Sequence, residues 1–337
     1  MNARFELVRG RRSSDGRSAI AAMGREVRAG LSRPPRSISP KYFYDAEGSK
    51  LFDAICDLPE YYVTRSERAL LEEHADSIVG LAGARALVEI GSGMARKTAL
   101  LTKALCDRNA SPIYIPFDIA PEAIDESARV LLDSHPRLRV RGVVGDFGHD
   151  FGRLAIHAPP ADGTRLFAFL GSTIGNLDEE AAPALLRSIS AIMVPADRFL
   201  LGIDLVKDSS LLNAAYNDAQ GVTAAFNKNV LRVLARELDG EIDEAAFEHL
   251  AFYNEPLQRI EMHLVSARAQ TMTLRAADLR IELAAGERIL TEISRKFTRA
   301  STERTLAGGG MELLEWIPDA LGMFALCVAR KAVLRKA

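Results

Sequence analysis

The feature that most constrains the fold is an alternation of short apolar runs with helical stretches between residues 86 and 204. Apolar runs occur at 86–90, 112–118, 137–144, 165–170 and 198–203, and stretches with helical spacing lie at 97–106, 122–132 and 179–192. Strands that alternate with helices form a parallel sheet with right-handed crossovers. The sequence therefore predicts an α/β fold with a parallel sheet core.

The alternation stops near residue 207 and returns only at the end of the chain. Residues 209–250 have a mostly helical pattern, short strands are predicted at 259–265, 272–274 and 279–283, and a buried strand follows at 323–329. We therefore expect a discontinuous α+β substrate-binding domain, formed by 25–65 and 207–296. The core would consist of 66–206 and 297–337.

The N-terminal segment differs from the rest in charge. Residues 1–40 contain nine arginines, no lysine and three acids, so this segment carries +6. An arginine-rich targeting segment is one interpretation, but the acids and the lack of an apolar stretch before a cleavage site favour a solvated leader. We expect residues 1–24 to be a disordered basic leader, with one short helix near 19–29.

Composition excludes several classes of function. The chain has 43 basic and 45 acidic residues, so it lacks the broad positive charge of a nucleic-acid-binding protein. The sequence contains no run of 18 apolar residues, so it predicts no membrane-spanning helix. The three cysteines and six histidines are scattered without metal-ligand spacing. We expect a cytoplasmic monomer with no metal, no nucleic-acid partner and no membrane contact.

A helix is predicted from about Arg65 to Gly80. Thr64 and Glu67 have the spacing of a capping box, in which the two side chains satisfy backbone N–H groups at the start of a helix. Leu70, Leu71 and Ile78 follow at helical spacing.

The strongest local signal is a glycine turn, EIGSGMARKT at 89–98, between a strand and a helix. Such a turn lets a ligand approach the backbone, and the helix N-terminus favours an anionic group. A dinucleotide-binding loop and a phosphate loop both require glycine at position 96, where this chain has Arg96. Asp204, at a later strand end, still resembles the magnesium-binding residue of phosphate-loop enzymes.

A site for S-adenosylmethionine (AdoMet) is the third interpretation, and it needs polar residues at the next two strand ends. Asp118 ends the second predicted strand, 25 residues after Gly93, and would accept the ribose hydroxyls. Asp146 ends the third strand and would meet the adenine, with Phe147 beside the ring. Ligands of open α/β sheets bind at these carboxyl ends.

Longer sequence strings extend beyond this general pattern. They are KYFYDAEGS at 41–49, LPEYY at 58–62, GSTIGN at 171–176, DLVKD at 204–208, GVTAAFN at 221–227 and LTEIS at 290–294. From about Arg25 to Ala329 the chain closely resembles the bacterial L-histidine Nα-methyltransferases of the ergothioneine pathway. The resemblance implies a class I methyltransferase (Rossmann-like) core, a second α+β domain for the substrate, and trimethylation of the α-amino group of L-histidine to hercynine.

The resemblance also implies the residues that bind AdoMet as methyl donor. These are Gly91, Lys97, Asp118, Asp146 and Phe147, with Tyr44 closing over the cofactor. Without the resemblance, Lys97 is a solvated helix residue.

For the substrate, the resemblance implies that Asn176 and Tyr216 hold the carboxylate and that Tyr61 lies beside the α-amino group and orients it. Glu292 and Ser294 would bind the imidazole. At a spacing of two on a strand these two side chains face the same side.

Each of these residues also has a simpler interpretation. Asn176 could cap the following helix, Tyr61 could be a core residue, and Glu292 with Ser294 could form a polar strand face. Met262, which the resemblance places near the imidazole, could fill the core. Three other functions remain open: methylation of another amino acid such as tryptophan, a phosphate-loop enzyme, and a non-catalytic AdoMet-binding protein.

Overall fold

The computed structural model describes residues 4–8, 16–93, 97–146, 150–158 and 164–332. The chain divides into two compact units. The first consists of Met1–Gly10, Val63–Val206 and Phe297–Ala337, and the second of Arg11–Tyr62 and Lys207–Lys296. Phe147, predicted to bind the cofactor, and residues 94–96 of the glycine turn lie outside the described residues.

The first unit is built on an eight-stranded sheet in the order β1-β5-β4-β3-β6-β7-β15-β14. Its strands are β1 (Phe5–Val8), β3 (Ala84–Ile90), β4 (Ile113–Asp118), β5 (Arg139–Val144), β6 (Thr164–Phe169), β7 (Arg198–Asp204), β14 (Met311–Pro318) and β15 (Phe324–Lys331). The strands β1 to β7 of this sheet pair in parallel, and β15 runs antiparallel between β7 and β14. The parallel core predicted from the alternation is confirmed.

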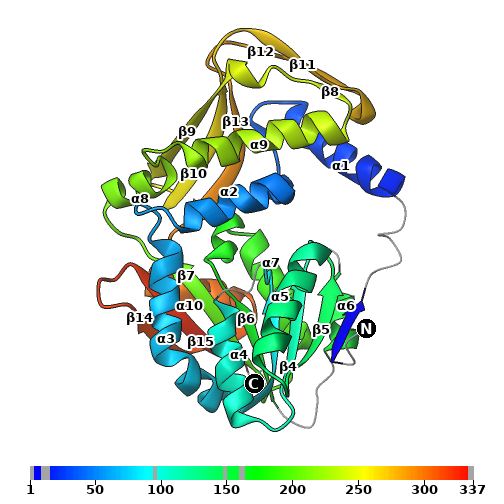
Figure 1. The fold of residues 1–337 in the computed structure, drawn as a ribbon. Helices are drawn as coiled ribbons and strands as arrows, with labels where there is room; N and C mark the ends of the chain where they lie inside the picture. The colour runs from blue at the N-terminus through cyan, green and yellow to red at the C-terminus, as the bar shows by residue number, and fades with distance from the viewer. Residues whose placement is uncertain (1–3, 9–15, 94–96, 147–149, 159–163, 333–337) are drawn as a thin grey trace, which may run out of the picture. The chain divides into compact units, whose positions relative to one another are not determined.

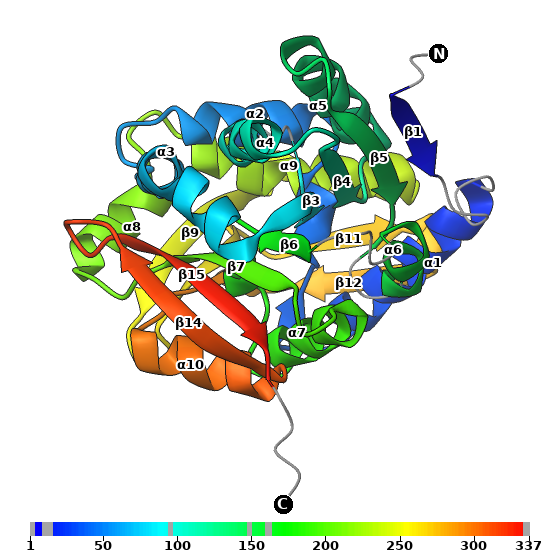
Figure 2. The same ribbon diagram turned by 90° about the horizontal axis from the view of Figure 1, so that it is seen from below.

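Helices cover both faces of this sheet (Figure 2). One face carries α3 (Val63–Ala82), α4 (Thr98–Arg108) and α5 (Pro121–Ser134), and the other carries α6 (Phe151–His157), α7 (Ala181–Ile192) and α10 (Arg299–Gly308). Because both faces are covered, the central strands are apolar along almost their whole length, as Phe167, Phe169, Phe199 and Leu201 illustrate.

The second unit combines two small sheets with four helices (Figure 1). One sheet has the order β2-β13-β10-β9 and the other β12-β11-β8. The strands are β2 (Arg36–Ser37), β8 (Gly240–Glu241), β9 (Phe247–Asn254), β10 (Arg259–Ser266), β11 (Gln270–Leu274), β12 (Leu279–Leu283) and β13 (Arg288–Arg295). The helices are α1 (Gly16–Leu31), α2 (Ala46–Cys56), α8 (Ser209–Tyr216) and α9 (Val222–Glu237), with single turns η2 (Pro40–Phe43), η4 (Glu244–Ala246) and η5 (Arg275–Ala277).

The leader differs from its prediction. Residues 5–8 are not disordered, because they form β1 and pair in parallel with β5, from Phe5 opposite Val140 to Val8 opposite Val143. Helix α1 begins at Gly16 and buries Val27 and Leu31. An edge strand and an apolar helix stripe therefore order parts of a segment whose composition suggested a solvated chain.

Two further predictions need correction. The helical pattern expected to run to residue 250 ends with α9 at Glu237, and Phe247–Asn254 forms β9, which pairs antiparallel with β10. Strand β14 was not predicted, because it lies at the edge of its sheet and several of its residues are exposed. In both strands half-burial removes the continuous apolar run that marks a central strand.

A buried ion pair fixes the amino ends of β6 and β7. Arg165 and Asp197 are 1% and 0% exposed, and the Arg165 Nε and Nη2 donate to Asp197 Oδ2 at 3.1 and 2.6 Å. The other Asp197 oxygen accepts from the backbone N–H of Arg165 at 2.9 Å, and Arg165 also donates to the carbonyl of Ile192. The carboxylate of Asp197 and the guanidinium of Arg165 therefore both find hydrogen-bond partners inside the protein.

We expect Asp197→Ala to lower the free energy of unfolding by about 3–5 kcal/mol, because it leaves the buried Arg165 guanidinium without its counter-charge. Urea denaturation followed by circular dichroism measures this loss. The matched control is Glu72→Ala, which removes the exposed Arg68–Glu72 pair on α3 and should cost no more than about 1 kcal/mol. Equal losses in the two variants would contradict the assignment.

Candidate active site

In the first unit, the glycine turn after β3 is tied to the end of β4. The N–H of Gly91 donates to the carbonyl of Phe117 at 2.8 Å, and the N–H of Gly93 donates to Asp118 Oδ2 at 2.9 Å. Gly91 and Gly93 have φ of 70° and 48°, and a Cβ at Gly93 would meet no atom of the described residues within 4 Å. Among these residues, Gly93 therefore leaves room for a ligand beside its backbone.

Asp118 stands at the end of β4 as predicted. Its Oδ1 accepts from the N–H of Ala120 at 2.9 Å, so each carboxylate oxygen has one backbone donor. Burial raises the pKa of Asp118, and these backbone donors oppose that rise. Each oxygen can accept a second hydrogen bond, so the carboxylate is able to bind two neighbouring hydroxyls of a ribose.

Glu89 lies on β3, two residues before Gly91, and connects the start of α4 to the sheet. Its Oε1 accepts from the Thr98 hydroxyl and its Oε2 from the Tyr114 hydroxyl, both at 2.5 Å. Burial raises the pKa of Glu89 to about 7. The sequence indicated the glycines here but not this carboxyl group beneath them.

Lys97, predicted to bind the cofactor, is paired with a residue that we assigned to a capping box. Glu67 is 0% exposed, accepts from Lys97 Nζ, and accepts from the N–H of Gly171 at 2.7 and 3.0 Å. The capping-box prediction is therefore wrong, because α3 already begins at Val63 and the Glu67 carboxylate points into the protein.

The chain makes room for the Glu67 carboxylate with a glycine on β7. A Cβ at Gly202 would lie 2.0 Å from Glu67 Oε1, well inside van der Waals contact. Glu67 thus joins α3, the start of α4 and the turn after β6 around one buried charge.

Asn176 ends the turn η3 (Thr173–Asn176), which follows β6. The helix-cap interpretation does not hold, because Asp178 accepts from the N–H groups of Glu180 and Ala181 before α7. Asp146 follows β5, and its N–H donates to Asp150 Oδ2 at 3.0 Å. Since β5, β4, β3 and β6 are neighbours, their carboxyl ends bring Asp146, Asp118, Gly91 and Asn176 to the same edge of the sheet.

In the second unit, one face of β13 carries the residues predicted to bind the imidazole. Glu292 and Ser294 alternate with outward residues, and Met262 of β10 is the direct partner of Glu292 in the antiparallel ladder. Directly opposed residues share a sheet face. Met262, Glu292 and Ser294 therefore lie together, each 9% exposed or less.

Tyr216, at the end of α8, joins this group. Its hydroxyl is hydrogen-bonded to Ser294 Oγ at 2.8 Å, and its ring centroid lies 6.3 Å from that of Tyr61. Burial raises the pKa of Tyr61 well above its usual range, and the neighbouring Tyr216 raises it further. The structure thus brings five predicted residues of this unit together: Tyr61, Tyr216, Met262, Glu292 and Ser294.

Tyr44, the sixth predicted residue of the second unit, belongs to an aromatic cluster with Phe52 and Phe226, whose ring centroids both lie 5.7 Å away. Tyr44 is 41% exposed, so part of this residue is accessible from solvent.

Sequence reasoning missed Lys296. It is 3% exposed, and its ammonium donates to Ser294 Oγ at 2.8 Å and to Tyr216 Oη at 3.2 Å. Lys296 continues the alternate spacing of Glu292 and Ser294, but on sequence alone a lysine after a strand is interpreted as a solvated residue.

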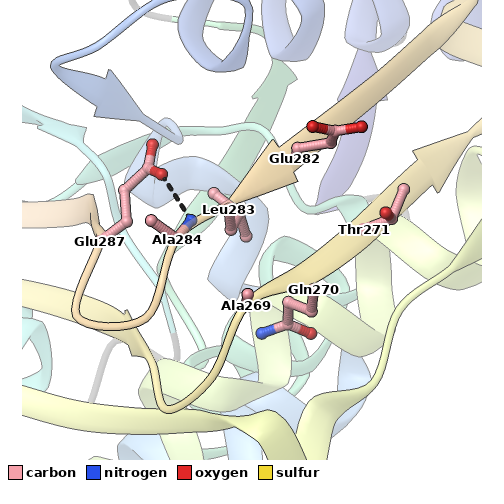
Figure 3. A pocket seen from close by; sticks show the side chains of 7 residues that line it. All are labelled: Ala269, Gln270, Thr271, Glu282, Leu283, Ala284 and Glu287. Atoms are coloured by element: carbon pink, nitrogen blue, oxygen red, sulfur yellow. Dashed lines mark hydrogen bonds between the residues drawn. The ribbon is translucent and has the colours of Figure 1, made fainter.

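The second unit also has a hollow beside the β11–β12 hairpin (Figure 3). In it, Glu287 accepts from the N–H of Ala284 at 2.9 Å. None of the predicted site residues lines this hollow, whose lining consists of Ala269, Gln270, Thr271, Glu282, Leu283, Ala284 and Glu287.

Comparison with known proteins agrees with this geometry. The model of a family described as histidine-specific, SAM-dependent methyltransferases matches residues 23–331. A histidine N-alpha-methyltransferase of Mycolicibacterium smegmatis is 44% identical over 312 residues, which cover 93% of this chain and 96% of the relative. The corresponding protein of Mycobacterium tuberculosis is 40% identical over 92% of this chain and 95% of its own length.

More distant relatives and structures were also found. Ergothioneine biosynthesis protein 1 of Neurospora crassa is 29% identical over 84% of this chain and 32% of its own length. A solved putative methyltransferase from Thermobifida fusca covers 92% of this chain and 95% of its own, with 13% identity and a TM-score of 0.48.

The parallel sheet, with its glycine turn after β3 and its acid after β4, is a class I methyltransferase fold. The match over residues 23–331 and the two mycobacterial relatives make the family specific. The chain belongs to the histidine-specific, SAM-dependent methyltransferases. Among the described residues, no helix has the length and apolar character needed to cross a membrane.

The raised pKa of Glu89 predicts a pH-dependent stability. The folded pKa is about 7 and the ordinary value is 4.5, so the stabilising contribution is complete below about pH 4.5 and is lost as the pH rises through 7. Relative to Glu89→Gln, which cannot ionise, the wild type should lose on the order of 3 kcal/mol between pH 4.5 and 7.5.

Urea denaturation of both proteins at several pH values measures this difference. Glu72→Gln on the exposed face of α3 is the control and should show no such trend. A constant difference between wild type and Glu89→Gln across this range would contradict the prediction.

Proposed function

We propose that this protein transfers methyl groups from AdoMet to the α-amino group of L-histidine, three times, to give hercynine, the first step of ergothioneine biosynthesis. The observation that carries this proposal is the shared face of β13 and β10, where Glu292, Ser294 and Met262 lie together. A carboxylate and a hydroxyl on one apolar-lined face suit an imidazole, whose two nitrogens need one acceptor and one donor.

The residues of the first unit fit AdoMet. A side chain at Gly93 would meet no described atom, so a ligand has room there, and Asp118 keeps acceptor capacity for the ribose hydroxyls. Lys97 would face the methionine carboxylate, Asp146 the adenine, and Phe147 its ring, and Tyr44, of the second unit, is assigned to close over the cofactor. When bound, AdoMet supplies an electrophilic methyl group on a sulfonium.

For the amino acid, we assign the carboxylate to Asn176 and Tyr216. The side-chain amide of Asn176 can donate to a carboxylate, and Tyr216 would do so by turning its hydroxyl proton away from Ser294 Oγ, to which it donates in this structure. With the imidazole bound by Glu292 and Ser294, histidine is held by its two ends and its α-amino group lies between them, beside Tyr61.

The α-amino group must lose a proton before it can attack. Tyr61 cannot serve as a strong base near neutral pH, because its raised pKa keeps the phenol protonated. We assign Tyr61 the role of orienting the amine lone pair and solvent the role of proton acceptor. Most of the rate acceleration then comes from positioning the amine in a dry site.

Binding at the two ends also permits successive transfers. After each methylation the amine must present another position, and rotation about the bond between the α-carbon and nitrogen does this without disturbing either end. The relatives named for histidine methylation support histidine over tryptophan. The indole N–H only donates, so one of the two polar groups on β13 would stay unpaired with tryptophan.

We place the reaction in the cytoplasm. The three cysteines, Cys56, Cys106 and Cys327, are free thiols, which suits a reducing compartment.

The decisive experiment is to incubate the protein with AdoMet and each of the twenty amino acids and to identify the products by mass spectrometry. We expect histidine to gain three methyl groups and to form hercynine. A reaction that stops at one methyl group would refute trimethylation, and turnover of tryptophan without histidine would refute the substrate.

Glu292→Ala should weaken histidine binding by about 10- to 150-fold, since a hydrogen bond to a charged group contributes roughly 1.5–3 kcal/mol. Larger apolar amino acids should improve relative to histidine. Calorimetry measures both affinities, and Glu282→Ala, an acid of β12 in the same unit, is the matched control. Unchanged histidine affinity in Glu292→Ala would remove this residue from the site.

The rate of methyl transfer should fall at low pH, because the α-amino group becomes fully protonated and solvent must remove its proton. In Tyr61→Phe we expect kcat to fall while the pH dependence keeps its shape, since Tyr61 orients the amine and does not titrate. Single-turnover rates from pH 6 to 9 test this. A flat profile in the wild type, or a changed profile in Tyr61→Phe, would contradict the mechanism.

A further inference from the structure

We propose that Lys296 is a specificity-determining residue that makes the imidazole end of the site select the neutral ring of histidine. This proposal rests on the proposed function, because it takes Glu292 and Ser294 as the groups that bind the ring. It adds a role for a residue that the sequence motifs did not include.

Lys296 completes a row of three polar side chains at alternate positions. Glu292 and Ser294 lie on β13, and Lys296 follows directly after its end. The Lys296 ammonium is 3% exposed, donates to Ser294 Oγ at 2.8 Å and to Tyr216 Oη at 3.2 Å, and lies 5.0 Å from the Tyr216 ring centroid. A buried ammonium in hydrogen-bond contact with both hydroxyls dominates their electrostatic environment.

An ammonium group can only donate hydrogen bonds, so Ser294 Oγ and Tyr216 Oη both accept from it. The hydroxyl proton of Ser294 is then directed away from Lys296 and is available to a ring nitrogen. A neutral imidazole offers one accepting nitrogen and one N–H, which match Ser294 as donor and Glu292 as acceptor. An imidazolium offers two donors and would share the Ser294 oxygen with a second cation.

The charges lead to the same conclusion. Glu292 alone would favour the cationic ring, because an opposite charge stabilises the protonated form. Lys296, which donates to Ser294 from the next alternate position, opposes a second positive charge on the ring, because like charges repel strongly in a protein interior. Glu292 and Lys296 therefore carry opposite charges at the alternate positions on either side of Ser294. The lysine offsets the preference for the protonated ring that the carboxylate would create.

Tyr61 and His249 are two further titratable groups of the second unit beside this cluster. Tyr61 stays protonated, and Cys56 and Tyr44 lie behind it. His249, from β9, contacts the backbone carbonyl of Tyr216 through Nε2 at 3.0 Å, and burial lowers its pKa. We therefore assign the loss of histidine affinity at low pH to protonation of the substrate's imidazole ring. Glu292 and Lys296 determine how strongly the protonated ring is disfavoured.

The test compares histidine with β-(1,2,4-triazol-3-yl)alanine, an isostere whose ring stays neutral from pH 5 to 8.5. Calorimetry of the intact wild type should show histidine affinity falling below about pH 6.5, the ordinary pKa of the ring, relative to the triazole. Tighter histidine binding at pH 5.5 than at pH 7.5, measured against the triazole, would overturn the proposal without any variant.

In Lys296→Met we expect the fall of this histidine-to-triazole affinity ratio between pH 7.5 and pH 5.5 to be at least about twofold smaller than in the wild type, because the bound imidazolium is no longer repelled. Lys296→Arg, which keeps the charge, should restore the wild-type fall. Lys50→Met, at an exposed lysine of α2 in the same unit, is the control and should leave it unchanged.

Weaker histidine binding in Lys296→Met, with the same fall of the ratio between pH 7.5 and pH 5.5 as in the wild type, would reduce Lys296 to a structural role and overturn the proposal. Lys296→Gln, a neutral side chain that still donates, provides the same comparison if the methionine variant does not fold. Failure of the wild type to bind or methylate either ligand, with AdoMet still bound, would instead refute the proposed function.

Discussion

The buried carboxylate of Glu67 is the constraint on which the first unit depends. A fully buried charge must be compensated by partners inside the protein, and here these are Lys97 Nζ and the N–H of Gly171. Lys97 begins the helix after the cofactor turn, and Gly171 begins the segment that leads to Asn176. One charge thus fixes the position of a residue assigned to AdoMet relative to the segment assigned to the substrate carboxylate. Gly202 is part of the same arrangement, because any side chain there would displace the carboxylate.

How far the sequence predicted the fold depended on burial. The central strands β3, β4, β6 and β7 are apolar on both sides, so their runs and their alternation with helices predicted the parallel core. Strands β9 and β14 are half-exposed, and β1 is four residues long, so they lack that signal. Strands β9, β14 and β1 form because they pair with β10, β15 and β5, respectively. Local sequence patterns do not specify these pairings.

The same limit applies to the site. The glycine turn and Asp118 were predicted because a parallel sheet places strand ends at one edge, whatever the rest of the chain does. Glu67 was assigned to a helix cap because its spacing from Thr64 is a local pattern, whereas its partners lie 30 and 104 residues away. Lys296 was missed for a related reason: on sequence alone a lysine after a strand is a solvated residue, and only the tertiary structure shows that its ammonium is buried against two hydroxyls.

These contacts together suggest why methylation would occur at the α-amino group, although histidine has three nitrogens. A ring nitrogen that donates to Glu292 has no lone pair available, and one that accepts from Ser294 has its lone pair occupied by that hydrogen bond. Lys296 strengthens the second restriction, since it directs the Ser294 proton toward the ring. In the proposed binding mode, the carboxylate would be engaged separately by its own donors. The α-amino group would then remain the nucleophile whose lone pair is not committed, and Tyr61, a neutral phenol whose ring centroid lies 6.3 Å from that of Tyr216, would orient it without taking its proton. On this account, the choice of nitrogen follows from hydrogen bonds that engage both ring nitrogens and needs no difference in intrinsic reactivity.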